Sequence, residues 1–189
     1  ILVGGIDTGK LPDYKRPYFR RQFGIMEREL GLLDDRTAFD NVSLAMYATE
    51  QPARLIKKRV GQVLSTTGIS HRALAFPHEL SVGETARVLL ARALVINPKI
   101  MIVVEPTANL DPDASWDLMC LLDDLNRLGV TMIVASHSRE LVTIMKKRVI
   151  TLVSGVKVLD EKHGIYNSKA MDIFEEKRVE SERKRNQKL

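Results

Sequence analysis

The chain has 189 residues, of which 44% are hydrophobic and 28% charged, and a formal net charge of +5. This length suits one domain with a substantial core. No run of about 18 apolar residues occurs, which excludes a membrane-spanning helix. The single cysteine, Cys120, excludes an internal disulfide, and we expect a small core residue in a cytoplasmic protein.

The chain opens on the apolar run Ile1–Val3, which carries neither a basic region nor a small-residue cleavage site. We therefore expect no signal peptide, and we expect the natural protein to begin further upstream. The next residues, Gly4–Lys10, match the phosphate-binding pattern G-x-x-x-x-G-K. We reject this match, because Leu11 offers no hydroxyl to Mg²⁺ and Pro12 would interrupt the helix that such a loop needs.

Short β-rich runs alternate with helical patterns, which predicts an α/β domain with a mostly parallel central sheet. The two clearest strands are nearly all apolar, as strands buried on both faces are. The charged tail covers residues 167–189. In chain order we expect a helix that Thr37 caps and that runs through Met46, followed by a helix over Arg54–Thr67. A strand over Ile100–Glu105 precedes a helix that Asp111 caps and that runs to about Leu128. We then expect a strand over Thr131–Ser136 and a hairpin of Val149–Val153 and Val156–Leu159 that turns at Gly155.

A serine and a glycine begin an amphipathic helix in residues 80–94, LSVGETARVLLARAL. Backbone N–H groups at the start of such a helix, together with the positive end of its dipole, bind anions. Ser81 and Gly83 are therefore candidate phosphate-binding residues. An ordinary capped helix would use the same residues, and five residues alone do not decide between the two.

Two polar residues follow the apolar strands. Glu105 stands at the carboxyl end of the first, where parallel α/β sheets place their ligands. A carboxylate there can orient or deprotonate a water molecule that attacks a phosphate. His137 stands at the end of the next strand and could contact a γ-phosphate, although such a histidine on its own is more typical of an exposed loop.

In this order and spacing, the three segments resemble the ATP-binding cassette (ABC) ATPases. Residues 80–84, LSVGE, are similar to the signature motif LSGGQ or LSGGE. Residues 103–111, VVEPTANLD, are similar to the Walker B strand, catalytic glutamate and D-loop, and Ser136-His137 resemble the switch histidine. The resemblance extends from Ile1 to about Tyr166.

This resemblance implies a P-loop NTPase-like nucleotide-binding domain over residues 1–166, with a helical subdomain at about 40–97 and without the N-terminal strands and Walker A helix. It also implies ATP and Mg²⁺ as cofactors, with no metal ligand assigned, and a homodimer. Ser81, Gly83 and Glu84 of one subunit would face ATP held by the other. Glu105 would activate water, His137 would steady the γ-phosphate, and Asp111 would carry the D-loop contact between subunits.

Within the ABC family, the sequence is similar to the FtsE branch of bacterial cell-division ATPases. Residues 32–42 (LLDDRTAFDNV), residues 76–80 (FPHEL) and the pair Ser115-Trp116 carry this likeness. It implies a polytopic membrane partner of FtsX type, which would dock on the helical region from about Asp40 to Phe76. The protein would then lie peripherally on the inner face of the bacterial plasma membrane, and its closure would signal to enzymes that cut peptidoglycan.

Three motif positions depart from the family. Val104 stands where the family has the Asp that holds Mg²⁺ through water, and valine offers no oxygen to a hard cation. Arg28 replaces the metal-facing glutamine of the Q-loop, where a cation would oppose Mg²⁺. Val82 replaces a signature glycine and adds bulk where phosphate approaches the backbone.

Two functions therefore compete. The chain is an ABC-type ATP hydrolase by resemblance, or it is a non-hydrolysing scaffold or fragment that only docks on a membrane partner. Without Walker A and the Walker B Asp, we expect this chain alone to be inactive. A nucleic-acid-binding role rests only on charge, much of it in Lys10–Arg21, because no recognition motif or aromatic platform occurs. We expect no nucleic-acid partner.

Overall fold

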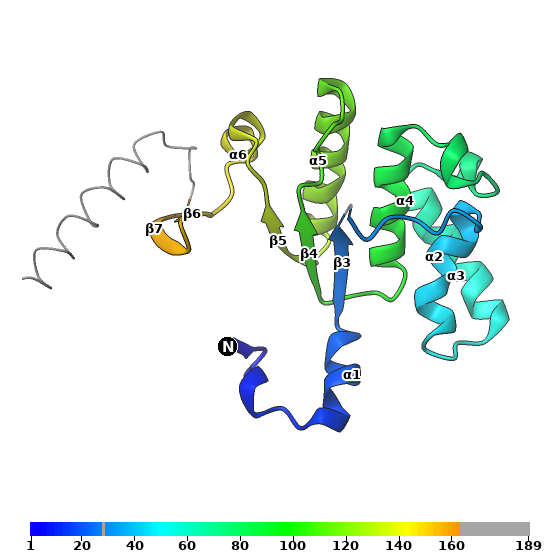
Figure 1. Ribbon diagram of the computed structural model, residues 1–189, viewed down its shortest axis with the longest axis horizontal. Coiled ribbons are helices and arrows are strands. Elements are labelled where there is room, and N and C mark those ends of the chain that lie inside the picture. The colour runs from blue at the N-terminus through cyan, green and yellow to red at the C-terminus, as the bar shows by residue number, and fades with distance from the viewer. Residues whose placement is uncertain (28, 163–189) are drawn as a thin grey trace, which may run out of the picture. The chain divides into compact units, whose positions relative to one another are not determined.

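The computed structural model describes residues 1–27 and 29–162, which divide by their internal contacts into a first unit, residues 1–136, and a second unit from His137 onward. The first unit holds a parallel sheet in the order β3-β4-β5 (Figure 1). Its strands are β3 (Phe23–Glu27), β4 (Ile100–Val104) and β5 (Thr131–Ala135). The α/β class and the parallel sheet predicted from the sequence are confirmed.

Four helices accompany this sheet: α2 (Ala38–Tyr47), α3 (Ala53–Thr66), α4 (Val82–Leu94) and α5 (Pro112–Arg127). α4 contacts β3 as well as α2 and α3, and so joins the sheet to the other two helices. The core between them consists of aliphatic and methionine side chains, among them Met26, Val42, Val60, Leu90 and Met101.

Gly24 allows β3 to approach α4 closely. A Cβ atom at this position would lie 2.5 Å from the carbonyl oxygen of Ala93 and 2.8 Å from Cγ of Pro98. Only a residue without a side chain fits between the strand and the end of α4.

Strand β5 differs from the sequence-based expectation that it is buried on both faces. It pairs only with β4 among the strands described, and the side chain of Ile133 is 59% exposed. Ile25 of β3, which shares a cross-strand row with Ile133 through Ile102, is 48% exposed. The strand is apolar, as predicted, but this face of the sheet is not covered in the described part of the chain.

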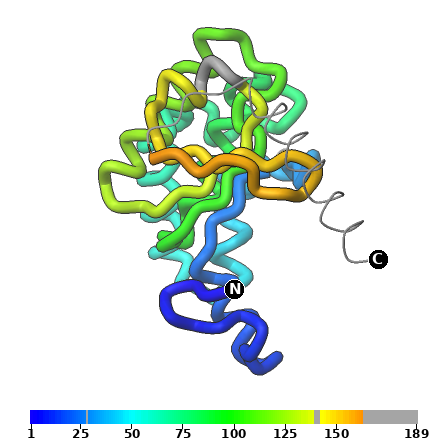
Figure 2. Tube along the Cα trace, turned by 90° about the vertical axis from the view of Figure 1, so that its left-hand side faces the viewer, coloured from blue at the N-terminus to red at the C-terminus, as the bar shows by residue number. Residues whose placement is uncertain are grey.

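The N-terminal residues form a hairpin of β1 (Leu2–Val3) and β2 (Ile6–Asp7), followed by two 3₁₀ turns, η1 (Thr8–Lys10) and η2 (Asp13–Lys15), and by α1 (Arg16–Arg20). Figures 1 and 2 both place these elements beyond the amino end of β3. Two further 3₁₀ turns, η3 (Ser70–Arg72) and η4 (Pro77–Glu79), precede α4.

The second unit contains α6 (Arg139–Met145) and the antiparallel hairpin of β6 (Val149–Val153) and β7 (Val156–Glu161), which confirms the predicted hairpin. Arg148 donates two hydrogen bonds, of 2.8 and 3.0 Å, to Asp160 across this hairpin. These bonds, together with one from Lys157, lower the pKa of Asp160 to about 2. The tail, residues 167–189, lies outside the described residues, and no helix within them is long and apolar enough to cross a membrane.

Candidate functional site

The segment Gly4–Lys10 is a hairpin turn and not a phosphate-binding loop. Gly4 and Gly5 take φ of 55° and 81° between two paired strands, a left-handed backbone at both central residues that glycine adopts without strain. Lys10 ends the 3₁₀ turn η1 and does not begin an α-helix. The rejection of this pattern from the sequence is therefore confirmed.

The amino end of α4 is closed by a full capping box. The Oγ of Ser81 accepts a 3.2 Å hydrogen bond from the N–H of Glu84, and a carboxylate oxygen of Glu84 accepts one of 2.8 Å from the N–H of Ser81. Ser81 and Val82 are exposed, and Gly83 is half-buried. The first turn of this helix is thus fixed in place, with the positive end of the helix dipole directed to an exposed surface.

Glu84 points back toward the protein. Its carboxylate accepts a 2.8 Å hydrogen bond from Nε of Arg72, and Nε2 of His71 lies 3.7 Å away. The bond from Arg72, followed by that from the backbone of Ser81, lowers the pKa of Glu84 to about 2. Because the ion pair balances the carboxylate charge, Glu84 can cap α4 with little repulsion of an anion bound at the same helix end.

The start of α4 lies beside the start of α5. A Cβ atom at Gly83 would lie 3.6 Å from Cβ of Ala114. Asp111 caps α5, and its carboxylate accepts a 2.8 Å hydrogen bond from the N–H of Ala114. One turn further on, Arg87 and Asp117 are 3.6 Å apart at the nearest nitrogen and oxygen. The structure therefore brings residues 80–84, the expected signature segment, close to the start of the helix that Asp111, the expected D-loop residue, caps.

Glu105 follows directly on β4, at the carboxyl end of the sheet. Its N–H donates a 2.9 Å hydrogen bond to the carbonyl of Ala135, and its own carbonyl accepts one of 3.2 Å from Ala108. Its φ is 44°, a left-handed conformation that is rare for residues with a side chain. The half-buried Glu105 is held at the carboxyl end of the sheet, where ligands bind in open α/β sheets.

The residues at the expected metal position do not fit Mg²⁺. Val104 ends β4 and has no oxygen in its side chain. Within residues 1–27 and 29–162, no three His, Cys, Asp or Glu side chains lie close enough together to hold a metal ion. Arg28, the altered Q-loop position, lies outside the described residues, directly after β3. By contrast, the capped end of α4 does fit a phosphate group.

His137 is exposed and begins the second unit, so its position relative to Glu105 is not defined. Its role beside the γ-phosphate stays a prediction.

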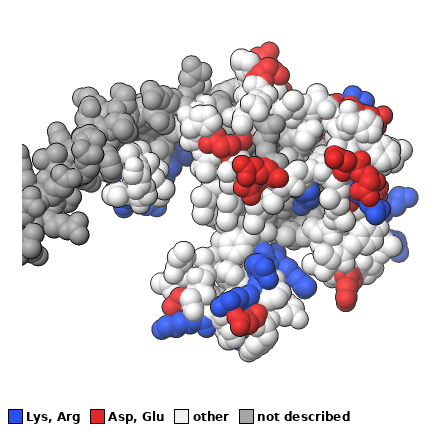
Figure 3. Space-filling view, viewed as in Figure 1, with Lys and Arg blue, Asp and Glu red and all other residues white. Residues whose placement is uncertain are grey.

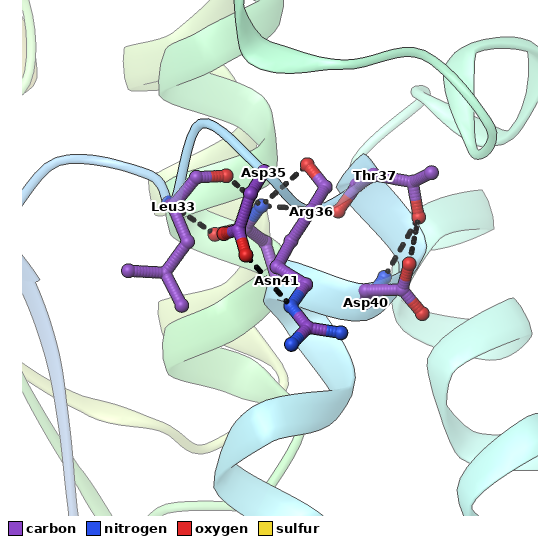
Figure 4. A network of polar contacts seen from close by, with 6 residues as sticks. All are labelled: Leu33, Asp35, Arg36, Thr37, Asp40 and Asn41. Atoms are coloured by element: carbon purple, nitrogen blue, oxygen red, sulfur yellow. Dashed lines mark hydrogen bonds and ion pairs between the residues drawn. The ribbon is translucent and has the colours of Figure 1, made fainter.

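The loop that precedes α2 is organised by one buried amide (Figure 4). Asn41 is 0% exposed, and its side chain accepts a 2.8 Å hydrogen bond from the N–H of Leu33. Its Nδ2 lies 3.0–3.1 Å from the carbonyls of Leu33, Arg36 and Thr37. Thr37 caps α2 through the N–H of Asp40, as predicted from the sequence.

The sequence profile of the family described as "ABC transporter" matches residues 1–108, which include the start of α4 and Glu105. The chain belongs to the ABC transporter ATPase family. It is 41% identical over 168 residues to the cell division ATP-binding protein FtsE of Bacillus subtilis. This alignment covers 89% of this chain and 74% of that protein. Its identity to FtsE of Mycobacterium tuberculosis is 38% over 166 residues, with 88% of this chain and 72% of that protein covered.

Solved structures give the same result for the fold. An ATP-binding cassette in a dimeric post-hydrolysis state, bound to ADP and Pi, superposes with a TM-score of 0.75 at 29% identity, over 87% of this chain and 73% of that one. CbiO1 from Clostridium perfringens, part of an ABC transporter complex, superposes with a TM-score of 0.72 at 31% identity, over 92% of this chain and 68% of that one. The cassette fold and the resemblance stated from the sequence are confirmed.

Sequence reasoning missed the contacts that hold the start of the signature helix of this cassette. Glu84 stands three residues after Ser81, a spacing that indicates a capping box and could have been noticed. The ion pair of Glu84 with Arg72 could not, because a separation of 12 residues has no local signal.

Proposed function

We propose that the chain acts as an FtsE-type cassette, which pairs with a second cassette around ATP and transmits this closure to a membrane protein of FtsX type in bacterial cell division. The observation that carries the proposal is the capped, exposed start of α4 beside the start of α5. The identity of 41% to an FtsE protein over most of the chain supports the cell-division branch.

In this proposal the residues of the chain have separate tasks. The Oγ of Ser81 and the first N–H groups of α4 bind the terminal phosphate of ATP held by the other cassette. Glu105 orients the attacking water, and His137 contacts the same phosphate. Asp111 fixes the first turn of α5 against the partner's D-loop.

A non-hydrolysing scaffold is the second candidate, and Val104 favours it. Without an oxygen at this position the chain lacks the family's indirect Mg²⁺ ligand, and metal ions supply much of the charge stabilisation in phosphoryl transfer. Such a cassette would still dock and still present Ser81 in trans.

The membrane partner would bind the region between Asp40 and Phe76. Several apolar side chains there are more than a third exposed and supply a contact surface: Leu44, Tyr47, Leu55, Leu74 and Phe76. A docked cassette would lie peripherally on the inner face of the plasma membrane.

The test of pairing mixes the labelled 189-residue chain with the FtsE protein of Bacillus subtilis and measures association by fluorescence anisotropy. We expect association in the presence of ATP and none without it. Ser81→Glu should abolish it, because a carboxylate at the helix start repels phosphate, whereas Ser65→Glu, on the exposed face of α3, should have no effect. Association without ATP, or equal loss in both variants, would refute the proposal.

A chimera separates hydrolysis from scaffolding. The N-terminal strands and phosphate-binding loop of the Bacillus protein are placed before Ile1, and ATP turnover is measured for chimeras that carry Val104 or Val104→Asp. Turnover that needs Val104→Asp and is abolished by Glu105→Gln identifies the scaffold as the native role. Turnover in the Val104 chimera that Glu105→Gln abolishes identifies the hydrolase.

A further inference from the structure

The segment from Lys10 to Gln22 concentrates positive charge at the amino end of the sheet. It contains five cations and one carboxylate, which leaves four excess positive charges, whereas the whole chain carries a net charge of +5. The carboxylate, Asp13, is paired with Arg16 at 2.8 Å. Figure 3 shows Lys and Arg side chains gathered on the lower part of the view, over the region of α1. All five cations are exposed: Lys10, Lys15, Arg16, Arg20 and Arg21.

The carboxyl end of this segment joins the sheet at β3. The rings of Phe19 and Phe23 meet edge to face, with centroids 5.2 Å apart, and so connect α1 to β3. The carbonyl of Gln22 accepts a 3.1 Å hydrogen bond from the N–H of Lys99. The exposed Lys99 therefore brings a sixth cation to the same edge. The charges therefore lie on described residues at the amino end of the sheet.

Two tyrosines lie among these cations, and both are largely exposed. Tyr14 is 70% and Tyr18 66% exposed. Nζ of Lys15 lies 5.7 Å from the ring centroid of Tyr14, and Cζ of Arg21 lies 5.1 Å from that of Tyr18. Each pair combines an apolar ring, a hydroxyl and a cation, the combination that proteins use at the headgroup level of membranes.

We propose that the basic–aromatic surface, defined as Lys10, Tyr14, Lys15, Arg16, Tyr18, Arg20, Arg21 and Lys99, binds the anionic headgroups of a phospholipid bilayer directly. Charge complementarity carries the choice of partner. A nucleic acid is the other polyanion that such a surface attracts, but the chain carries no nucleic-acid recognition motif. This contact would be additional to docking on a membrane protein and does not depend on ATP chemistry.

The experiment measures sedimentation of the 189-residue chain with vesicles of phosphatidylcholine alone or with a minority of phosphatidylglycerol. We expect binding only to the anionic vesicles, and a steep loss as salt is raised from about 0.1 to 1 M. Arg20→Gln with Arg21→Gln should weaken binding roughly 30-fold, from the typical contribution of each cation near an anionic surface. Lys57→Gln with Lys58→Gln, an exposed basic pair on α3, is the matched control and should leave binding unchanged.

Further variants keep the test decisive. If the Arg20 and Arg21 change unfolds α1, Lys10→Gln with Lys15→Gln, outside that helix, should give a similar loss. Tyr14→Ser and Tyr18→Ser should also weaken vesicle binding, whereas Trp116→Ser, at an exposed aromatic residue of α5, should not. Equal loss in the Lys57 and Lys58 control, equal binding to neutral vesicles, or tighter binding to short duplex DNA than to anionic vesicles would each overturn the proposal.

Discussion

Replacing Asn41 by alanine should destabilise the first unit strongly, because one buried side chain holds the loop before α2. The Asn41 amide contacts four backbone groups at 2.8–3.1 Å. Two of these groups keep another partner after the change: the carbonyl of Leu33 still accepts from Arg36, and the carbonyl of Thr37 still accepts from the N–H of residue 41. The N–H of Leu33 and the carbonyl of Arg36 keep none among the described residues.

The expected magnitude follows from these two orphaned groups. An unsatisfied buried polar group costs roughly 1–3 kcal/mol, so the two together cost about 2–6 kcal/mol. Leu33 is 47% exposed, and water can reach part of the loop. We therefore expect the lower range, about 2–4 kcal/mol, which is a large share of the roughly 5–15 kcal/mol by which domains are stable.

The assay is urea unfolding followed by far-UV circular dichroism. Gln62→Ala, which removes an exposed amide from α3, is the matched control and should change the free energy of unfolding by less than about 0.5 kcal/mol. Asn41→Asp preserves the volume but sets a carboxylate against three carbonyls, so it should destabilise at least as much as alanine near neutral pH. If Asn41→Ala costs no more than Gln62→Ala, the assignment of Asn41 as organiser of this loop is wrong.

Two other predictions concern the packing around α4. The pKa of Glu84 is about 2 in the folded protein, below its ordinary value, so its stabilising contribution is complete above about pH 5 and is lost as the pH falls toward 2. The free energy of unfolding of Glu84→Gln, measured in urea, should therefore be lower than that of the unchanged protein at pH 7, and this difference should shrink by pH 3. A difference that is independent of pH would contradict the ion pair with Arg72. Gly24→Ala should cost on the order of 1–3 kcal/mol in the same measurement, because the new Cβ would meet the carbonyl of Ala93. Gly61→Ala on α3, where a new Cβ would meet no atom within 4 Å, should instead stabilise the protein slightly. Equal effects of Gly24→Ala and Gly61→Ala on the free energy of unfolding would refute the close approach of β3 to α4.

The sequence predicted those parts of the fold that depend on local chemistry. The caps at Thr37 and Asp111 are present, and β4 and β5 end within one residue of the expected position. The exposed row of Ile25 and Ile133 was not predicted, because an apolar strand carries no sign of what covers it. The close contact of Gly24 with Ala93 likewise depends on residues far apart in the chain.

The candidate site was predicted as a set of residues and not as an arrangement. Ser81 and Asp111 were each chosen from a motif, but nothing in the spacing indicated that their helices begin side by side through Gly83 and Ala114. The direction of the Glu84 carboxylate was also unpredictable, since it depends on Arg72 in a separate 3₁₀ turn.

The retained motif residues differ in what they say about activity. Ser81 and Asp111 cap helices, and loss of either cap would cost about 1 kcal/mol of stability whether or not nucleotide binds. Their presence therefore fits a hydrolase and a scaffold equally. Val104 is as favourable for a β-strand as any residue, so folding alone accounts for it. Glu105 is different, because a left-handed backbone costs a residue with a Cβ roughly 1–2 kcal/mol that glycine would avoid. Among these positions, Glu105 is the one where local folding preference argues against the residue present, which is why the variant Glu105→Gln is the most informative about chemistry.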